Sequence, residues 1–404
     1  MWAASRRVLF LTVFIDLMGF GIVVPILAFV SKEYGASGMT LGLILGSFSL
    51  MQFLFSPIWG RLSDRIGRRP VLMISLFGNI LGFGTFAFAS NVAMLFATRI
   101  FSGIASASIS TAQAYIADTT DEESRSREMA RISMAFGLGL ILGPPIGGLL
   151  SSFGTGSLHF PPNRLPGLAA ATLSSIAMLM AIFMLPESLN PDSKSAAHRS
   201  SLLDNESWGI LFRTRGLRLA GSSLAVIMCA LASLSPILVM VGRDRFGLAA
   251  RDVGYLLGLM GIVVVILQWS AIHWFTQRLG DIGTGILGAG ALMFGLLLVP
   301  LTHARVVLIV ATCLMGVGQG LCHPTLSAFI TKVAPPSHRG GILGVSSSMT
   351  ALARMLGPAL VGFAYDALKT PGAIFSQAAI VSIGIALAMR LLTDPATAPE
   401  SHLP

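Results

Sequence analysis

The chain has 404 residues, of which 54% are hydrophobic and 11% are charged, and its formal net charge is +9. A soluble domain averages about 25% charged residues, so this composition excludes a soluble enzyme, a disordered scaffold and a secreted module. One bilayer crossing needs roughly 20 apolar residues, and the chain is long enough for a dozen. The sequence therefore predicts a polytopic α-helical membrane protein.

The basic excess does not indicate nucleic-acid binding, because Lys and Arg collect in the cytoplasmic loops of membrane proteins without acidic partners. The cysteines Cys229, Cys313 and Cys322 lie in apolar stretches. An odd number there argues against a disulfide framework. The sequence holds no Gly-Lys pair, and therefore no phosphate loop. We expect no enzyme activity, no cofactor and no bound metal.

Hydropathy divides the chain into twelve apolar segments, and a polar linker that begins at Pro186 separates two sets of six. This predicts an N-terminal six-helix bundle at 1–185, a cytoplasmic linker at 186–216 and a C-terminal six-helix bundle at 217–404. Most Lys and Arg residues fall in segments that are cytoplasmic if both termini are inside. The twelve segments are 8–30, 40–59, 71–90, 92–117, 130–152, 167–185, 217–241, 253–274, 284–302, 305–330, 341–364 and 372–392.

The first apolar segment carries Asp16, the only acidic residue deep inside any of the twelve. Burying a charge there costs roughly 2.5–3.5 kcal/mol even on the insertion scale, so a carboxylate without a role is hard to explain. Two interpretations remain open. Asp16 is either a structural partner of Arg99 or Arg354, or a protonatable group that couples transport to protons, and one residue can serve both.

The segment between the second and third apolar stretches, residues 60–70, is strongly basic. Gly60 and Gly67 permit a tight turn, and Asp64 supplies a counter-charge. Such a segment is at least an anchor for topology on the cytoplasmic side. The equivalent segment of the second half, residues 277–281, keeps an arginine and a glycine but lacks the charge cluster. The arginines of the first segment are Arg61, Arg65, Arg68 and Arg69.

The fourth apolar segment carries Arg99 about one third of the way along, followed by polar or small residues at alternating spacings of four and three. This spacing places them on one face of a helix. The stripe either holds helices together or lines a cavity. Its members are Arg99, Gly103, Ser106, Ser110 and Gln113.

The fifth apolar segment is rich in glycine. Gly139, Gly143 and Gly147 are four residues apart, so they share one helix face that another backbone can approach closely. Pro144 and Gly148 belong to the same motif. Close helix packing explains this stripe whatever other role it has.

The second half repeats the first at several positions with an offset of 214 residues. Parallel six-helix repeats are typical of transporters whose substrate site lies between the repeats near mid-membrane. Pro25-Ile26-Leu27 also recurs as Pro236-Ile237-Leu238 at an offset of 211, which relates Asp16 to Ile227, and Arg99 corresponds to Cys313 at an offset of 214. Both buried charges therefore belong to a first half that would handle protons. The positions repeated at this offset are Ser124-Arg125 and His338-Arg339, Gly143-Pro144 and Gly357-Pro358, and Gly148 and Gly362.

Three polar residues of the second half are candidates for lining a cavity. Gln319 and His323 lie in the tenth apolar segment and Arg354 lies in the eleventh. A histidine beside glycines is either a packed hydrogen-bonding group or a proton carrier. Arg354 is a candidate contact for an anion or for substrate.

The spacing G-x-x-x-D-R-x-G-R-R at residues 60–69 resembles the signature loop of the major facilitator superfamily. The string from Gly139 to Gly148 resembles a fifth-helix motif of its antiporter subfamilies. The fourth segment, from Arg99 to Ala117-Asp118-Thr119-Thr120, is similar to tetracycline efflux proteins and their relatives among the 12-spanner drug:proton antiporters. The resemblance is clear over residues 10–150. Those exporters also use an acidic residue in the ninth span, which residues 285–301 lack.

The resemblance implies twelve transmembrane helices in two pseudo-symmetric six-helix bundles, the major facilitator fold. It also implies that spans 1, 4, 7 and 10 line the cavity, and that Asp64 locks an inner gate at the start of the eleventh helix, whose N-terminal partial positive charge attracts a carboxylate. We expect a monomer in the inner or plasma membrane, with both termini cytoplasmic. Its expected partners are protons, a small-molecule substrate and the lipid bilayer.

The expected function is proton-coupled export of a small amphipathic or cationic organic solute by alternating access. Two other functions remain open. One is a symporter or facilitator that takes up a metabolite or lipid-like solute, and the direction of proton-driven flux separates it from an exporter. The other is a membrane sensor or scaffold, which predicts no flux of any solute.

Overall fold

The computed structural model describes residues 2–120, 122–189, 205–301, 304–335 and 339–392. Every regular element in these ranges is a helix. The chain divides into two compact units. One comprises Met1–Arg199 with Gly247–Gly258, and the other comprises Ser200–Phe246 with Leu259–Pro404.

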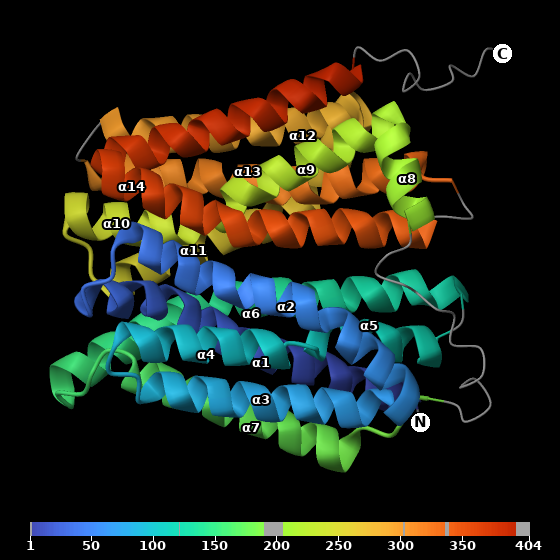
Figure 1. Cartoon of the computed structure of the whole chain (residues 1–404), viewed down its shortest axis with the longest axis horizontal. Helices are drawn as coiled ribbons and strands as arrows, with labels where there is room; N and C mark the ends of the chain where they lie inside the picture. Colours follow the sequence, from blue (N-terminus) through green and yellow to red (C-terminus); the bar gives the residue numbers. More distant parts are fainter. Residues whose placement is uncertain (1, 121, 190–204, 302–303, 336–338, 393–404) are drawn as a thin grey trace. The chain divides into compact units, whose positions relative to one another are not determined.

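The first unit is built from seven helices within the described residues, and α11 begins in it. α1 packs against α6 and α7, α3 packs against α7, and α2 packs against α4 (Figure 1). The helices are α1 (Trp2–Glu33), α2 (Gly38–Ile66), α3 (Arg68–Ala87), α4 (Val92–Ala105), α5 (Ser108–Thr119), α6 (Glu122–Ser157) and α7 (Arg164–Met184).

The regular elements described in the second unit are also all helices, with α9 packed on α14 and α12 on α13. The helices that follow α7 are α8 (Asn205–Arg213), α9 (Arg215–Ala232), α10 (Leu234–Phe246), α11 (Ala250–Ile266), η2 (Leu267–Ala271), α12 (Ile272–Leu298), η3 (Val299–Leu301), α13 (Arg305–Val333) and α14 (Arg339–Leu392).

Ten helical stretches of the described residues are long and apolar enough to cross a membrane. The stretch from Ala250 to Leu298 contains two of the twelve expected spans, and residues 341–364 are helical within α14 but are not among the ten. α12 and α14 each run through a sharp bend, at Gly280 (φ 69°) and Lys369 (φ 59°). The all-helical prediction is confirmed, whereas the count of twelve spans stays a prediction.

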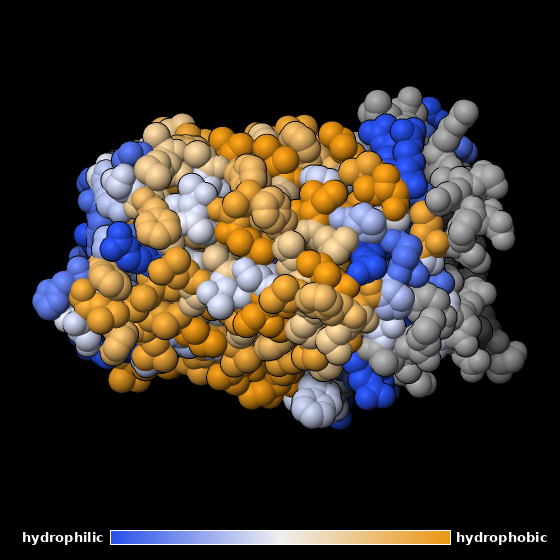
Figure 2. Space-filling model, turned by 90° about the horizontal axis from the view of Figure 1, so that it is seen from below, coloured by the Kyte–Doolittle hydropathy of each residue, from blue (hydrophilic) through white to orange (hydrophobic). Residues whose placement is uncertain are grey.

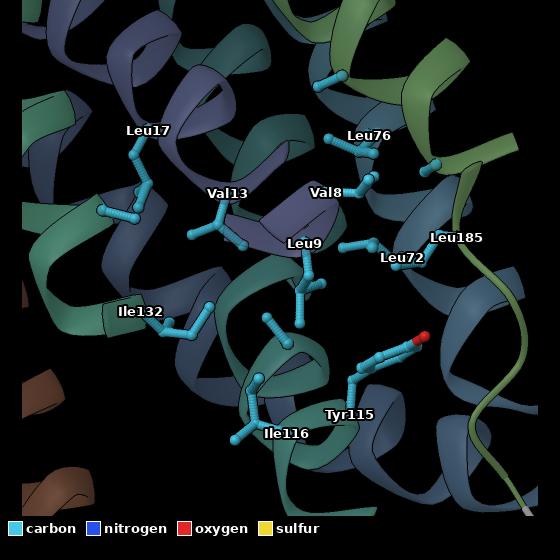
Figure 3. Packing of buried hydrophobic residues seen from close by; sticks show 14 residues of the cluster. Val8, Leu9, Val13, Leu17, Leu72, Leu76, Tyr115, Ile116, Ile132 and Leu185 are labelled. Carbon is cyan, nitrogen blue, oxygen red and sulfur yellow. The ribbon is translucent and has the colours of Figure 1, made fainter. Parts of the chain in front are cut away.

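Apolar side chains lie both inside the first unit and on the molecular surface. Figure 3 shows buried residues of α1, α3, α5, α6 and α7 in one cluster, among them Leu9, Val13, Leu72 and Ile116. Hydrophobic residues cover the middle of the face in Figure 2, and hydrophilic residues gather towards its two ends. Such an apolar surface would be unfavourable in water, but in a membrane it can face the lipid.

The fourth expected span, 92–117, is interrupted in the structure. α4 ends at Ala105 and α5 begins at Ser108, with Ser106 at ψ 82°. The amide of Ala107 donates to Ser75 Oγ of α3 at 3.0 Å. The hydroxyl of Ser106 accepts a bond from Gln52 of α2 at 3.0 Å. Side chains of two neighbouring helices thus hold the polar groups at the break.

Candidate functional site

Asp16 lies at the meeting point of four helices in the first unit. It projects from α1 and is only 3% exposed. Its Oδ1 accepts hydrogen bonds from Asn79 Nδ2 of α3 at 2.8 Å and from Ser174 Oγ of α7 at 3.3 Å. Its Oδ2 accepts a bond from Ser108 Oγ of α5 at 2.9 Å. The carboxylate therefore has three neutral hydrogen-bond donors.

The break between α4 and α5 brings a helix terminus to this carboxylate. Ser108, which donates to Asp16, is the first residue of the 12-residue helix α5. The N-terminus of a helix carries a partial positive charge that favours an anion. Discontinuous helices whose ends face ionic groups are a common construction in secondary transporters.

The partners of Asp16 suit a group that changes its protonation state. Serine hydroxyls can donate or accept a hydrogen bond. Ser108 and Ser174 can therefore donate to a carboxylate and accept from a carboxylic acid, while Asn79 donates in both cases. The cluster can hold Asp16 in either form without leaving it unpaired.

Arg99, one of the two partners considered for Asp16, does not contact it. The Arg99 side chain is 1% exposed on α4, and its guanidinium carbon lies 5.9 Å from the centre of the Phe48 ring. Within the described residues, Nε and Nη2 of Arg99 have no hydrogen-bond partner. If Asp16 only holds helices together, it does so through hydrogen bonds from neutral donors and not through an ion pair with Arg99.

The rest of the Arg99 stripe divides into a buried and an exposed part. Gly103 packs against the α2 backbone, where an added Cβ would lie 2.6 Å from the carbonyl oxygen of Phe48. Ser106 lies at the helix break, and Ser110 and Gln113 are exposed. The stripe thus contacts α2 at one end and is accessible at the other.

The basic segment 60–70 is a helix–turn–helix junction. α2 continues to Ile66, Gly67 adopts φ 112°, and α3 begins at Arg68. Arg68 is largely buried and forms ion pairs with Asp64 and, at 2.8 Å, with Asp118 of α5. It also donates to Ser63 Oγ at 2.7 Å. Gly60 has open space beside it, and Arg65 is exposed.

Glu187, which sequence reasoning missed, anchors this turn. Its carboxylate accepts bonds from the backbone amides of Arg68 at 2.8 Å and Arg69 at 3.2 Å. It also accepts from the amides of Ser188 at 2.9 Å and Leu189 at 3.0 Å. An added Cβ at Gly67 would collide with this carboxylate. In the sequence, the one signal for this role is the position of Glu187 in the first polar stretch after α7.

Further contacts attach the turn, and the stretch that contains Glu187, to the rest of the first unit. Arg69 donates to the carbonyl oxygens of Ala181, at 3.4 Å, and of Ile182 near the end of α7. The hydroxyl of Tyr115 donates to the carbonyl oxygen of Pro186 at 3.0 Å; this ring belongs to the cluster in Figure 3. In the sequence Asp118 is recognisable only as part of the Ala117-Asp118-Thr119-Thr120 motif, and the fold makes it a partner of Arg68.

The glycine motif of α6 packs against α1. A Cβ atom added at Gly139 would lie 2.9 Å from Leu17 Cβ, and one added at Gly143 would lie 2.6 Å from Gly21 Cα. One added at Gly147 would meet the carbonyl oxygen of Ile22. The helices α1 and α6 therefore touch through their backbones.

Gly148 and Pro144 face the start of α11, within the same unit. An added Cβ at Gly148 would lie 2.8 Å from Arg251 Cα, and one at Gly254 would lie 2.6 Å from the carbonyl oxygen of Pro144. The motif thus has two packing faces.

The second unit brings His323 and Arg354 close together. His323 of α13 is exposed and Arg354 of α14 is partly buried, and the Arg354 guanidinium is near enough to act electrostatically on the His323 ring. Gln319, one turn before His323, is partly buried. Among the described residues, no group of acidic, histidine or cysteine side chains is arranged to hold a metal ion.

The chain is similar to a large set of transport proteins. The family model of the Major Facilitator Superfamily matches residues 9–306 and 270–404. The chain is 32% identical over 363 residues to "Tetracycline resistance protein, class C" of Escherichia coli, with 88% of each chain covered. It is 27% identical over 400 residues to "Multidrug resistance protein 2" of Bacillus subtilis (strain 168), with 97% of this chain and 96% of that protein covered.

Solved structures share the fold at lower identity. The nucleoside transporter NupG aligns with a TM-score of 0.77 at 15% identity, covering 96% of this chain and 98% of that one. The human organic anion transporter MFSD10 (TETRAN) aligns with a TM-score of 0.70 at 23% identity, covering 96% and 99%.

Proposed function

The chain belongs to the major facilitator superfamily, and on that premise we propose that it exports a small amphipathic or cationic organic solute in exchange for protons. Membership makes it a multi-span membrane transporter and not an enzyme. Relatives that cover about nine-tenths of the chain bear the names of tetracycline and multidrug resistance proteins, which supports export of an organic solute.

The observation that carries the proposal is the environment of Asp16. A carboxyl group 3% exposed, with three hydrogen-bond donors from three other helices, supports a role in which Asp16 takes up and releases a proton. Protonation removes the charge that the α5 terminus stabilises. The change in charge therefore acts directly on the contact between α1 and α5.

The proposed cycle links this change to alternating access. Asp16 is protonated from the outside, and substrate that binds from the cytoplasm displaces the proton. The ion pairs of Asp64 with Arg68 and of Arg68 with Asp118 stabilise the conformation closed to the inside. In this cycle Arg99, Gln113, Gln319, His323 and Arg354 contact substrate, and the α6 motif enforces exchange.

The setting of this cycle is also part of the proposal. The protein works as a monomer in the inner or plasma membrane, with both termini cytoplasmic, and its two six-helix bundles at 1–185 and 217–404 are joined by the linker at 186–216. Residues 285–301 contain no acidic residue. Since the tetracycline exporters that the chain resembles use one there, this difference argues against tetracycline itself as the substrate and against the proton path of those exporters.

The experiment compares two fluxes in vesicles that contain purified protein, with ethidium as the cationic probe. Asp16→Asn removes the titrating group at similar size, so pH-gradient-driven ethidium transport should be lost while exchange without a gradient survives. In the wild type, ethidium affinity should depend on pH as Asp16 titrates, and the mutant should lose this dependence. Uphill transport retained by Asp16→Asn would falsify the coupling role.

Thr12→Val is a matched control. Thr12 lies one turn before Asp16 on α1, is fully buried, and has a hydroxyl without a hydrogen-bond partner among the described residues. The substitution removes a polar group but no titrating one, so gradient-driven transport should persist.

The direction of flux tests the alternative function. Gradient-driven uptake of ethidium into intact cells would favour the symporter that takes up its solute. A panel of organic solutes, read as thermal stabilisation of the protein, would then identify the substrate class.

A further inference from the structure

The turn after α2 has a structural counterpart in the second unit. Gly67 adopts φ 112° and Gly280 adopts φ 69°, a region that glycine enters without strain. A charged residue follows each glycine directly and begins the next helical segment: Arg68 in the first unit and Asp281 in the second. The backbone feature of the turn is therefore preserved where the arginine cluster is not.

Each of these charged residues forms an ion pair with the end of another helix. Arg68 Nε lies 2.8 Å from Asp118 Oδ2, one residue before the end of α5. Lys332 Nζ lies 2.5 Å from Asp281 Oδ2, one residue before the end of α13. Lys332 follows Asp118 by 214 residues, which is the offset of the sequence repeat. The same pair thus occurs in both units with its charges exchanged.

The second pair agrees better with the helix dipoles. A carboxylate is favoured at a helix N-terminus and an ammonium at a C-terminus. Asp281 and Lys332 occupy those positions, whereas Arg68 begins a helix and Asp118 ends one. This explains why the first pair has extra partners.

The extra partners of Arg68 are all in the first unit. Asp64 and the Ser63 hydroxyl contact its guanidinium, and the Glu187 carboxylate covers the first amides of α3. In the second unit the residue equivalent to Asp64 is the neutral Gln277, which bonds to His273 at 2.9 Å. Arg278 lies over the Trp274 ring at 4.4 Å.

We propose that Asp281 and Lys332 form a second clamp, with reversed polarity, that positions the part of α12 after Gly280 against the C-terminal end of α13 during transport. This rests on the proposed function of the chain as a transporter of organic solutes. The Asp281 side chain is 11% exposed and the Lys332 side chain 69%, so the carboxylate is held in place and the lysine reaches it from the surface. Both are positioning residues, and neither contacts substrate.

A double-mutant cycle on full-length protein tests the clamp. Asp281→Asn, Lys332→Met and the combined variant are compared with the wild type in vesicles, with ethidium as the probe. Each single change should lower the maximal rate about threefold, the scale of a partly exposed ion pair, and leave KM within about twofold. The combined variant should be no slower than either single one, because the same interaction is lost.

Two controls separate positioning from general damage. Lys332→Arg keeps the charge and should retain the wild-type rate, and Gln277→Ala alters the same turn outside the pair and should do the same. The proposal is overturned if the two single effects multiply in the combined variant, or if Lys332→Met transports at the wild-type rate.

The unfolding temperatures of the same four proteins test the ion pair without any transport measurement. Failure of the clamp and failure of the proposed function therefore give different results. If the wild type moves no ethidium and no other organic solute, the proposed function fails. Non-additive unfolding temperatures would still establish the clamp, and additive ones would refute it.

Discussion

The polar cluster around Asp16 and the equivalent place in the second unit differ in every side chain. In the first unit Asp16, Asn79, Ser108 and Ser174 come together from α1, α3, α5 and α7. The corresponding helices of the second unit, α9, α12, α13 and α14, carry Ile227, Leu292, Cys322 and Gly384, which follow the four polar residues by 211, 213, 214 and 210 residues. The first three are fully buried, and an added Cβ at Gly384 would lie 2.7 Å from Ile227.

The same helical scaffold therefore packs with a polar or an apolar centre. Apolar packing is sufficient in the second unit, so helix association alone does not require the carboxylate of the first. A buried charge that packing does not need is expected to serve chemistry. The comparison favours the coupling interpretation of Asp16 over the structural one.

The largest expected effect comes from giving the first unit the apolar pair of the second. Asp16→Leu combined with Asn79→Leu removes the carboxylate together with its amide partner, and the two serines can turn to backbone carbonyls of their own helices. We expect thermal stability near that of the wild type and complete loss of gradient-driven flux. Asp16→Leu alone should be less stable by about 1–3 kcal/mol, because Asn79 keeps an unpaired donor. Flux that still follows the gradient in the double variant would contradict this.

The converse substitution places a carboxylate in the second unit. The second unit carries Leu292, Cys322 and Gly384 in place of the three donors of Asp16, so the charge of Ile227→Asp should cost roughly 2.5–3.5 kcal/mol. The measurement is the unfolding temperature and the yield of monodisperse protein after detergent extraction. Ile227→Leu, which conserves volume, should cost less than about 1.5 kcal/mol. An Ile227→Asp protein as stable as the wild type would show that the two centres are less different than their side chains indicate.

A third prediction concerns what the two units share. Gly143 packs on Gly21 of α1, and its repeat partner Gly357 packs on the carbonyl oxygen of Cys229 of α9. Alanine at either position forces a backbone to move, so each should destabilise the protein by about 1–3 kcal/mol. Gly137→Ala and Gly344→Ala are matched controls in the same helices, with open space at the Cβ position. They should be neutral or slightly stabilising.

The pair of glycine variants also tests the antiport role of the α6 motif. If the motif enforces exchange, Gly143→Ala should increase proton leak without substrate, whereas Gly357→Ala should not. The measurement is the decay of a pH gradient in vesicles. Equal leak in both variants and the wild type would leave only the packing role.

The smallest expected effect concerns the turn after α2. Asp64→Asn removes one of two carboxylates that pair with Arg68. We expect the transport rate to fall about tenfold, because the substitution destabilises one conformation by roughly 1.4 kcal/mol. Membrane insertion and ligand affinity should stay nearly unchanged. Arg278→Ala, in the second unit, should have a much milder effect, since Arg278 is exposed and stacks on Trp274. Normal turnover of Asp64→Asn would refute the gate.

Sequence reasoning located most helices and the residue Asp16 but not the partners of that residue. Hydropathy is local, and a span of apolar residues reports its environment directly. The hydrogen bonds of Asp16 join residues 63, 92 and 158 positions apart. No spacing rule predicts such contacts, and the serines involved are ordinary residues of membrane helices.

Two other features could not be predicted for related reasons. The break at Ser106 contains neither proline nor glycine, and it depends on Ser75 and Gln52 from other helices. Glu187 follows α7 in a polar stretch that reads as linker, and its role depends on amides 118 and 119 residues earlier in the chain. The charges were visible in the sequence, but the fold decides which of them meet.

The break in the fourth span also constrains how the protein is made. α4 has 14 residues, which is about 21 Å of helix and too short for a hydrocarbon layer of roughly 30 Å. α4 and α5 must therefore enter the bilayer as one segment whose break carries two polar groups that other helices pair, the hydroxyl of Ser106 and the backbone amide of Ala107. Their partners, Gln52 and Ser75, lie on α2 and α3, which leave the ribosome earlier. The order of synthesis thus supplies the hydrogen-bond partners before the broken segment needs them, and a chain permuted to begin at α4 would have to insert this segment without them.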